Sequence, residues 1–298
     1  MRMADRVVMR VVGKQNSAFS MKTVLVVLPF LLTIAASAQT RKTFTYQLSP
    51  GGSVVIENQS GPVTVRSSGG RQVVVNATLH SDKVEIEPDQ TSNRVQLRTH
   101  LLQQRLAGDD ARVDYEVSVP ADVSLSIRSV NGPILVERSL SDINIEGDTA
   151  SVDVHDVSNG HVHVRTLSGP IKLANVSNGH VEIASVSGPV DLHRVSGPSV
   201  EVNTTNGKIT FEGDCAGDGN YVMTSHNGDI DVTLPATASV DIRARSLKGN
   251  VQNDFPFKPK QHSAPQATAG RAYAGTSNSG GSSLQLRSFS GTIRVKKL

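Results

Sequence analysis

The chain has a single cysteine, no tryptophan and few aromatic residues of any kind. Among 298 residues, aromatic side chains make up 4%, and the one cysteine is Cys215. A lone cysteine excludes a disulfide bond within the chain. The scarcity of aromatic residues agrees with a core of stacked valine and isoleucine side chains. Stability must therefore come from backbone ladders and aliphatic packing.

Sequence signatures of common enzyme classes are missing as well. There is no phosphate-binding loop, and the abundant Ser, His and Asp residues stand neither in a nucleophile elbow nor at the spacing of a catalytic triad. We therefore predict that the protein is not an enzyme, and we assign it no catalytic residue, no cofactor and no metal ligand.

No charge of one sign dominates the sequence beyond its first 38 residues. The full chain has 30 Lys and Arg residues and 27 Asp and Glu residues, of which five basic and one acidic residue lie in 1–38. The remaining 25 basic and 26 acidic residues give a net charge of −1. The basic isoelectric point therefore belongs to the leader, and we predict no nucleic-acid partner.

The N-terminal region predicts export. Residues 21–38 read as a signal peptide, with a basic start at Lys22, an apolar stretch over 24–36 and the small-x-small cleavage site Ala36-Ser37-Ala38. The apolar stretch is shorter than the ~20 residues of a membrane span, so none is expected after signal removal. Residues 1–20 are interpreted as a start-site artefact or an extended leader. The predicted location is periplasmic, associated with the cell envelope, or secreted.

A 19-residue repeat fills the middle of the sequence, from Ser139 to Asp214. The copies 158–176, 177–195 and 196–214 place their apolar residues at the same positions. Columns at a fixed period are typical of solenoids, in which each unit buries its apolar edge only against its neighbours. The columns are Val162/Val181/Val200, Val164/Ile183/Val202, Ile171/Val190/Ile209 and Leu173/Leu192/Phe211.

Each copy contains two short strands and two turns. In the copy 158–176, Val162 and Val164 alternate with polar residues before the turn Ser168-Gly169, and a second alternating segment follows it. Alternation indicates a strand with one face inward, and Gly and Asn tolerate the positive φ that tight turns need. We predict an all-β fold: a single-chain parallel β-solenoid with two short strands per ~19-residue coil, capped by an N-terminal irregular β segment.

The rest of the sequence departs from this period. Residues 39–119 alternate as strands but off-period, which predicts an N-terminal β cap. His100–Ala107 is expected to form one short helix, since little else in the chain has helical spacing. Solenoid repeats are expected over 120–254. Residues 255–283 are rich in Pro, Gly, Ser and Ala and predict a mobile loop, and 284–298 return to the strand pattern as a terminal coil.

One polar face stands out as a candidate metal site. His161 and His163 share a strand, and His180 and Glu182 occupy the same positions one coil later, all alternating with inward residues. Neighbouring strands lie about 4.8 Å apart, which suits a divalent metal, and Asp142 falls in register to orient His161. The alternative is an ordinary polar face, which the short His-x-His pattern favours.

Two further features have simple structural interpretations. Lys172 stacks between Asp153 and Asp191, which predicts charge complementarity along an exposed column. The acidic, Gly-rich segment Glu212–Asn220 resembles a calcium loop only loosely and is interpreted as a bulged turn, with Cys215 as a spectator thiol.

The strand segment Val113–Pro120 (VDYEVSVP) and the recurrent Ser/Asn-Gly-x-Ile/Val strands resemble a known bacterial group. They are similar to the exported "putative adhesin" domain-of-unknown-function family, over about Phe44 to Val295, and to the head domains of auto-transporter adhesins. The resemblance implies a single-chain β-solenoid and offers no catalytic residues. Some members are associated with envelope stress.

The function expected from this reading is binding. We predict a non-enzymatic, exported, adhesin-like envelope protein that presents a polar repeat surface to an envelope or extracellular partner, a glycan, a peptide or a protein. The alternatives are a metal-binding or hydrolytic protein that uses the outward His/Glu face, and an envelope-stress-associated structural module. A module that polymerises end to end also stays open, as does the oligomeric state.

Overall fold

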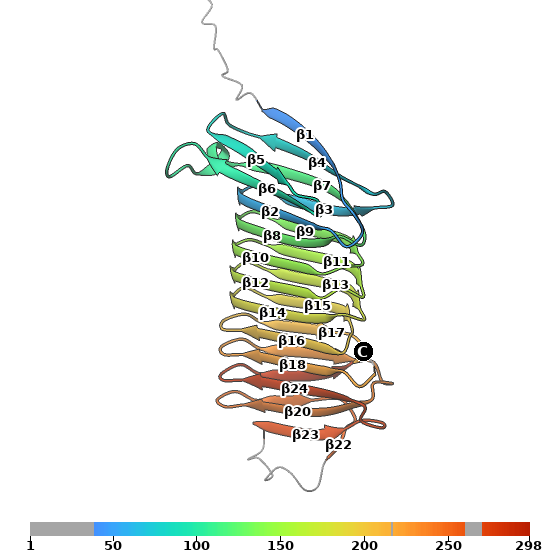
Figure 1. Cartoon of the computed structure of the whole chain (residues 1–298). Coiled ribbons are helices and arrows are strands. Elements are labelled where there is room, and N and C mark those ends of the chain that lie inside the picture. Colours follow the sequence, from blue (N-terminus) through green and yellow to red (C-terminus); the bar gives the residue numbers. More distant parts are fainter. Residues whose placement is uncertain (1–38, 216, 260–269) are drawn as a thin grey trace, which may run out of the picture. The chain divides into compact units, whose positions relative to one another are not determined.

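The structure is a computed structural model that describes residues 39–215, 217–259 and 270–298. The segments 1–20 and 21–38, including the expected signal peptide, lie outside the described residues. In the described part, no helix is long and apolar enough to cross a membrane. The described chain forms two sheets that face each other, with one short 3-10 helix, η1 (Gly108–Ala111) (Figure 1).

Sheet A contains twelve strands. In spatial order they are β1 (Thr40–Gln47), β4 (Gln72–Leu79), β7 (Val113–Pro120), β3 (Val63–Ser68), β9 (Ile134–Ser139), β11 (Val152–Ser158), β13 (Ile171–Ser177), β15 (Val190–Val195), β17 (Ile209–Glu212), β19 (Ile230–Leu234), β25 (Ile293–Lys297) and β21 (Val251–Asn253).

Sheet B contains thirteen strands. In spatial order they are β22 (Lys258–Pro259), β23 (Ala272–Thr276), β20 (Val240–Ser246), β24 (Ser282–Ser288), β18 (Asn220–Ser225), β16 (Ser199–Thr204), β14 (His180–Ser187), β12 (Val162–Ser168), β10 (Ile143–Thr149), β8 (Ser124–Asn131), β2 (Ser53–Ser60), β6 (Arg94–Leu101) and β5 (Val84–Gln90).

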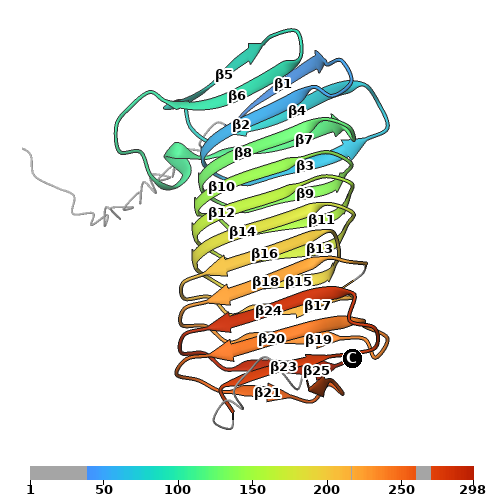
Figure 2. The same cartoon turned by 60° about the horizontal axis from the view of Figure 1, so that its bottom comes forward.

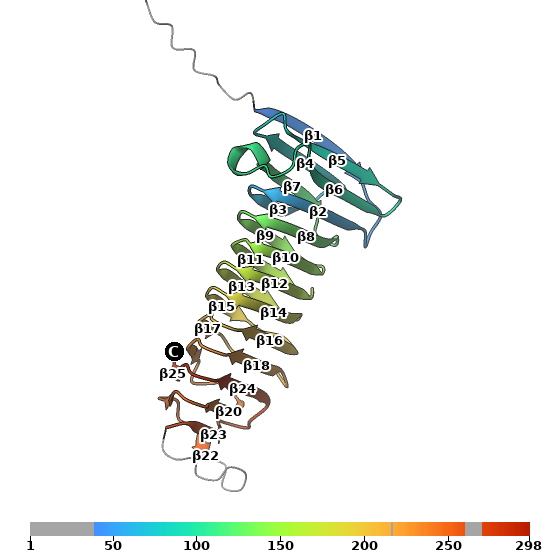
Figure 3. The same cartoon turned by 90° about the vertical axis from the view of Figure 1, so that its left-hand side faces the viewer.

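The predicted two-strand coil is confirmed. Each coil places one strand in sheet B and the next in sheet A, and successive coils pair in parallel, as Figure 3 shows for β10–β11, β12–β13 and β14–β15. Val162 pairs with Val181, and Val181 with Val200, so the ladder register is the 19-residue repeat. These side chains are at most 1% exposed, because alternation turns them all between the two sheets.

The N-terminal boundary differs from the expected one at residue 119. Strands β2 and β3 belong to the parallel ladders, and they lie between the coil β8–β9 and the strands β6 and β7. The first coil in the sequence is therefore the second in space. The ends of the two sheets are closed by antiparallel strands, with β4 and β1 beyond β7 and β5 beyond β6.

The C-terminal end shows the same inversion. Strand β24 lies between β18 and β20, and β25 lies between β19 and β21, as Figure 2 shows. The segment 284–298, expected as a terminal coil, is thus inserted one coil inside the stack. Strands β20 and β21 form the outer coil instead; β23 pairs antiparallel with β20, and β22 pairs antiparallel with β23.

Two local predictions were wrong. The helix expected over His100–Ala107 does not form, because His100 and Leu101 end strand β6 opposite β5 and a turn follows; among the described residues only η1 is helical. The loop expected over 255–283 is largely structured where it is described, because Phe255, Phe257 and Tyr273 pack together with ring centroids 4.7 and 5.9 Å apart. Its residues 260–269 lie outside the described part.

The turns of successive coils are linked by a ladder of hydrogen bonds through serine hydroxyls. The Ser225 hydroxyl accepts the N–H of Gly228 at 2.8 Å and donates to the carbonyl of Gly207, one coil earlier, at 3.1 Å. Ser288 accepts the N–H of Gly291 at 2.8 Å and donates to the carbonyl of Gly228 at 3.3 Å. A Cβ on Gly228 would collide with the Gly207 carbonyl, so close stacking requires glycine there.

Candidate functional site

The four residues of the candidate metal face do share one surface, the outer face of sheet B. They form two separate pairs. The rings of His161 and His180 stack at 4.7 Å with an interplanar angle of 9°, and Nδ1 of His163 lies 3.2 Å from Oε2 of Glu182. Stacking places the two rings parallel, so their nitrogens do not converge on a common point.

No three of these four residues bring their ligand atoms within 4.8 Å of one another in the described chain. Asp142 has a different task from the expected one. Its Oδ1 accepts the backbone N–H of His161 at 2.9 Å, so it fixes the turn rather than the imidazole. The geometry therefore fits the polar-face interpretation better than a preformed metal site.

The Lys172 column is in the predicted register. Lys172 pairs with Asp153 on one side and with Asp191 on the other. Within the described ranges no ion pair joins these three side chains at 4.0 Å or less. Their charge complementarity is therefore only the weak attraction of solvated groups.

The Gly-rich segment Glu212–Asn220 forms hydrogen bonds with the inserted C-terminal coil. The hydroxyl of Ser282, which begins β24, lies 2.8 Å from the carbonyl oxygen of Cys215 and 2.6 Å from that of Gly217. The Cys215 side chain is 2% exposed, and burial raises the pKa of its thiol, which keeps it protonated and unreactive. The segment thus has a structural task that its acidic residues do not suggest.

A cavity of about 520 Å³ lies on the outer face of sheet A, over β1, β4 and β7, and the sequence did not predict it. Arg41 supplies positive charge, while Asp114 and Glu116 supply negative charge. Each comes from a strand in which the alternate residues face the core. Only the spatial order β1-β4-β7 brings them together, because β7 follows β4 by more than thirty residues.

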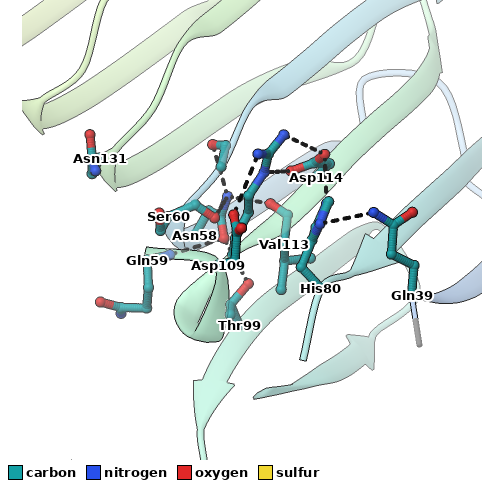
Figure 4. A network of polar contacts seen from close by, with 12 residues as sticks. Gln39, Asn58, Gln59, Ser60, His80, Thr99, Asp109, Val113, Asp114 and Asn131 are labelled. Atoms are coloured by element: carbon teal, nitrogen blue, oxygen red, sulfur yellow. Dashed lines mark hydrogen bonds and ion pairs between the residues drawn. The ribbon is translucent and has the colours of Figure 1, made fainter. Parts of the chain in front are cut away.

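A chain of polar contacts joins Gln39, His80 and Asp114, three of the residues that line this cavity (Figure 4). Arg112 donates to both oxygens of Asp114 at 2.8 and 3.0 Å. Nε2 of His80 lies 2.9 Å from Asp114, and the Gln39 amide lies 3.3 Å from Nδ1 of His80. A carboxylate can only accept, so Nε2 of His80 donates and Nδ1 accepts from Gln39.

Charge and burial act in opposite directions on Asp114. Burial raises the pKa of its carboxyl, but the hydrogen bonds from Arg112 and His80 outweigh burial, and the pKa lies below its ordinary value. Both ring nitrogens of His80 are occupied, so His80 has no lone pair free to act as a base. The cavity is suited to holding a polar group and not to moving a proton.

A second polar group lies inside the fold, where the inverted coils meet. Asn58 of β2 donates to the carbonyls of Ser60, Gly61 and Val113 at 3.0, 3.2 and 2.9 Å. Its Oδ1 accepts from the hydroxyl of Thr99 at 2.9 Å, and Figure 4 shows this contact beside Val113. Asn58 stands where most other coils have Ser or Thr three residues before a turn glycine, and that difference is the sequence signal that was missed.

One column of alternating charge follows the spatial order of the coils on sheet B. Arg98 approaches Glu57 at 3.4 Å, and Arg128 approaches Glu146 at 3.6 Å. Opposite charges in adjacent strands attract, whereas like charges directly opposite repel. The column runs through Glu87, Arg98, Glu57, Arg128, Glu146 and Arg165, on β5, β6, β2, β8, β10 and β12.

Exposed aliphatic side chains gather at the turns that leave sheet B. Leu167, Val186 and Leu247 each occupy the position after the turn Ser or Thr, and they are 57, 47 and 47% exposed. Between them in the stack, the rings of His226 and Phe289 stack at 4.6 Å. We call the edge formed by the aliphatic residues Leu167, Val186 and Leu247, with the stacked aromatic pair between them, the aliphatic turn edge.

Comparison with solved structures gave two neighbours of low sequence identity. A "putative cell adhesion protein" from Clostridium sporogenes is 12% identical, covers 88% of this chain and 100% of its own, and has a TM-score of 0.29. A "putative adhesin" from Bacteroides fragilis is 11% identical, covers 88% of this chain and 99% of its own, and has a TM-score of 0.48. Comparison with curated proteins gave no match.

The family comparison covers most of the chain. The model of the Toastrack DUF4097 family, a family of unknown function, matches residues 52–296. This range begins one residue before β2 and ends within β25, so it includes all the parallel coils and the inserted C-terminal one. The solenoid resemblance seen in the sequence is thereby confirmed, and the chain belongs to the Toastrack DUF4097 family.

Proposed function

We propose that the protein is a non-enzymatic, exported component of the cell envelope that binds a partner through the polar outer faces of its solenoid. The proposal is supported by the division of side chains between inside and outside. Apolar columns fill the space between the sheets, so the outer faces are left to polar and charged residues in fixed register.

The outer face of sheet B carries this proposal. One column on it consists of Asn144, His163, Glu182 and Glu201, in register on four successive strands. Adjacent members lie about 4.8 Å apart, a spacing set by the backbone ladder. A rigid row of hydrogen-bonding groups at constant spacing suits a ligand that is itself extended and repetitive. A glycan or an extended peptide has that form.

Absence of catalysis fits the chemistry of the described residues. His163 is paired with Glu182, and His80 is held by two partners. The family and the neighbours named above are not enzymes by description. Export is supported by the signal-like segment 21–38 in the sequence and by the adhesin names of the structural neighbours.

The test is binding of the purified full chain to isolated envelope polysaccharide, peptidoglycan and surface-protein fractions. The variant Glu182→Lys/Glu201→Lys reverses charge on sheet B, and the matched control Asp153→Lys/Asp191→Lys reverses the same charge on sheet A. We expect binding to fall about 10-fold or more in the first variant only. Equal binding by both variants and the wild type, or no binding to any fraction, would contradict the proposal.

A third variant separates protein from glycan partners. Leu167→Ser/Val186→Ser changes only the aliphatic turn edge, which a glycan has no reason to contact. Loss of binding in this variant as well as in Glu182→Lys/Glu201→Lys indicates a protein partner that covers both surfaces. Loss in the charge variant alone indicates a glycan or a short peptide.

A further inference from the structure

A second cluster of metal-ligating side chains lies on the hairpin β5–β6, far in sequence from the His161 face. The two strands are antiparallel, and β5 is the last strand of sheet B. Val84 and Ile86 turn inward and are 3 and 6% exposed. Glu85 and Glu87 therefore turn outward together, on the solvent side of the sheet.

The partner strand adds a histidine to the same surface. Glu85 and His100 are directly opposite in the ladder, so their side chains rise side by side. Nδ1 of His100 lies 3.8 Å from Oε1 of Glu87, its diagonal neighbour. One ligand atom from each of Glu85, Glu87 and His100 lies within 4.8 Å of the other two, and no other such trio occurs in the part of the chain that the structure describes.

The flanking cations pair with other carboxylates. Lys83 precedes Glu85 on the same face, but its ammonium lies 2.6 Å from Asp110. Arg98 is opposite Glu87 in the ladder, but its guanidinium approaches Glu57 on β2 at 3.4 Å. The two glutamates thus bring two carboxylates beside the His100 imidazole, and a divalent cation would offset the charge of both.

From this juxtaposition we propose that Glu85, Glu87 and His100 form a binding site for a divalent transition metal ion, with zinc as the favoured ion. One imidazole nitrogen and two carboxylate oxygens are a donor set that zinc accepts, whereas calcium and magnesium prefer oxygen alone. Glu87 and His100 are 50 and 48% exposed, so their side chains have room to draw in to the ~2.0–2.2 Å of metal bonds.

Three protein ligands leave a coordination position open. A water molecule fills it in the isolated protein, and a carboxylate of a bound partner could replace that water. The ion also bridges β5 to β6, so it strengthens the last strand of the sheet. This inference does not depend on binding at the outer columns of the central coils.

The experiment titrates the purified, metal-free full chain with zinc by calorimetry and with cobalt by visible absorption, at pH 7. We expect one ion per chain and an imidazole-containing cobalt spectrum. The variants His100→Gln and Glu85→Gln/Glu87→Gln keep side-chain size, and each should weaken binding about 10-fold or more. The matched control, His163→Gln/Glu182→Gln, removes a His–Glu pair from another part of sheet B and should leave binding unchanged.

Circular dichroism of each variant establishes that it folds. Three results would overturn the proposal: zinc affinity of the wild type weaker than ~1 mM, affinity unchanged in His100→Gln, or affinity lost in the control variant instead. The last result would transfer the site to the His161 face. None of them bears on envelope binding, which is measured with separate variants.

Discussion

The inserted C-terminal coil leads to a prediction that separates its position in space from its position in the sequence. Ile293 begins β25, five residues before the C-terminal Leu298, and is fully buried. It pairs with Ile230 on one side and with Val251 on the other. A residue so close to a chain end usually frays, but this one has coils on both sides.

We therefore expect Ile293→Ala to lower the free energy of unfolding as much as the same substitution in the middle of the solenoid. Truncating a buried isoleucine to alanine removes about 2–5 kcal/mol, because the surrounding side chains collapse only partly into the cavity. Ile209 on β17 is the internal reference, since it too is fully buried between two coils. Val251 lies on the outer coil and is only partly buried, so Val251→Ala should lower the free energy of unfolding by about 1 kcal/mol.

Urea unfolding followed by far-ultraviolet circular dichroism measures these differences, since the chain has no tryptophan to report by fluorescence. Solenoids can unfold in stages, so hydrogen exchange of the β24 and β25 amides gives the second measurement. The reasoning fails if Ile293→Ala costs less than half of Ile209→Ala, or if the β25 amides exchange as fast as those of an end strand.

Three further predictions follow from the turns, the buried amide and the C-terminal ion pairs. Gly228→Ala forces a methyl group against the Gly207 carbonyl and should lower stability by about 1–3 kcal/mol in thermal melts, whereas Gly69→Ala, with open space around it, should change stability little. Asn58→Leu leaves the carbonyls of Ser60, Gly61 and Val113 without their donor, so we expect the free energy of unfolding to fall by at least about 2 kcal/mol; a loss no larger than that of Asn220→Leu, at an exposed position of β18, would contradict this. Burial raises the pKa of Asp231, but its bonds to Lys208 and Arg294 at 2.7 and 3.1 Å outweigh burial, so the pKa lies below its ordinary value. The stability that results is fully present above pH ~4, where the carboxyl ionises in the unfolded chain. It is lost as the pH falls through the lower pKa of the folded state. Melting temperatures of Arg294→Gln should accordingly differ from the wild type at pH 7 and converge with it only as the pH falls through the lowered folded pKa of Asp231; a difference that stays constant with falling pH would exclude this linkage.

The repeat predicted the core because inward residues are constrained in every coil. Val162, Val181 and Val200 had to align for the period to exist, and the ladder register is the same alignment. The apolar columns do not indicate the spatial order of the coils. Ile230, Ile293 and Val251 fit one column equally well, so hydrophobic pattern alone favours sequential stacking over insertion.

Polar residues hold the information that the apolar ones lack. Asn58 can donate to the Val113 carbonyl only if β2 lies against β6 and β7. The charges from Glu87 to Arg165 change sign from strand to strand only in the inverted order. Interpreting them requires knowing which strands are adjacent, so they explain the order without predicting it. The His100–Ala107 helix failed for a related reason: pairing of Leu101 with Val84 outweighs a local helical spacing.

The inversion at both ends explains how a parallel ladder avoids growing without limit. A coil that ended the stack with its own parallel strands would offer two long unpaired edges to another molecule. Here the four outermost strands are poor templates: β21 and β22 have three and two residues, β5 and β22 contain proline, and β1 carries Arg41 and Lys42. Short strands, missing N–H donors and charge each oppose edge-to-edge pairing. Under the proposed function, a partner would therefore approach through side chains of the outer faces and turns, where the polar columns, the Glu85–Glu87–His100 cluster and the aliphatic turn edge all lie.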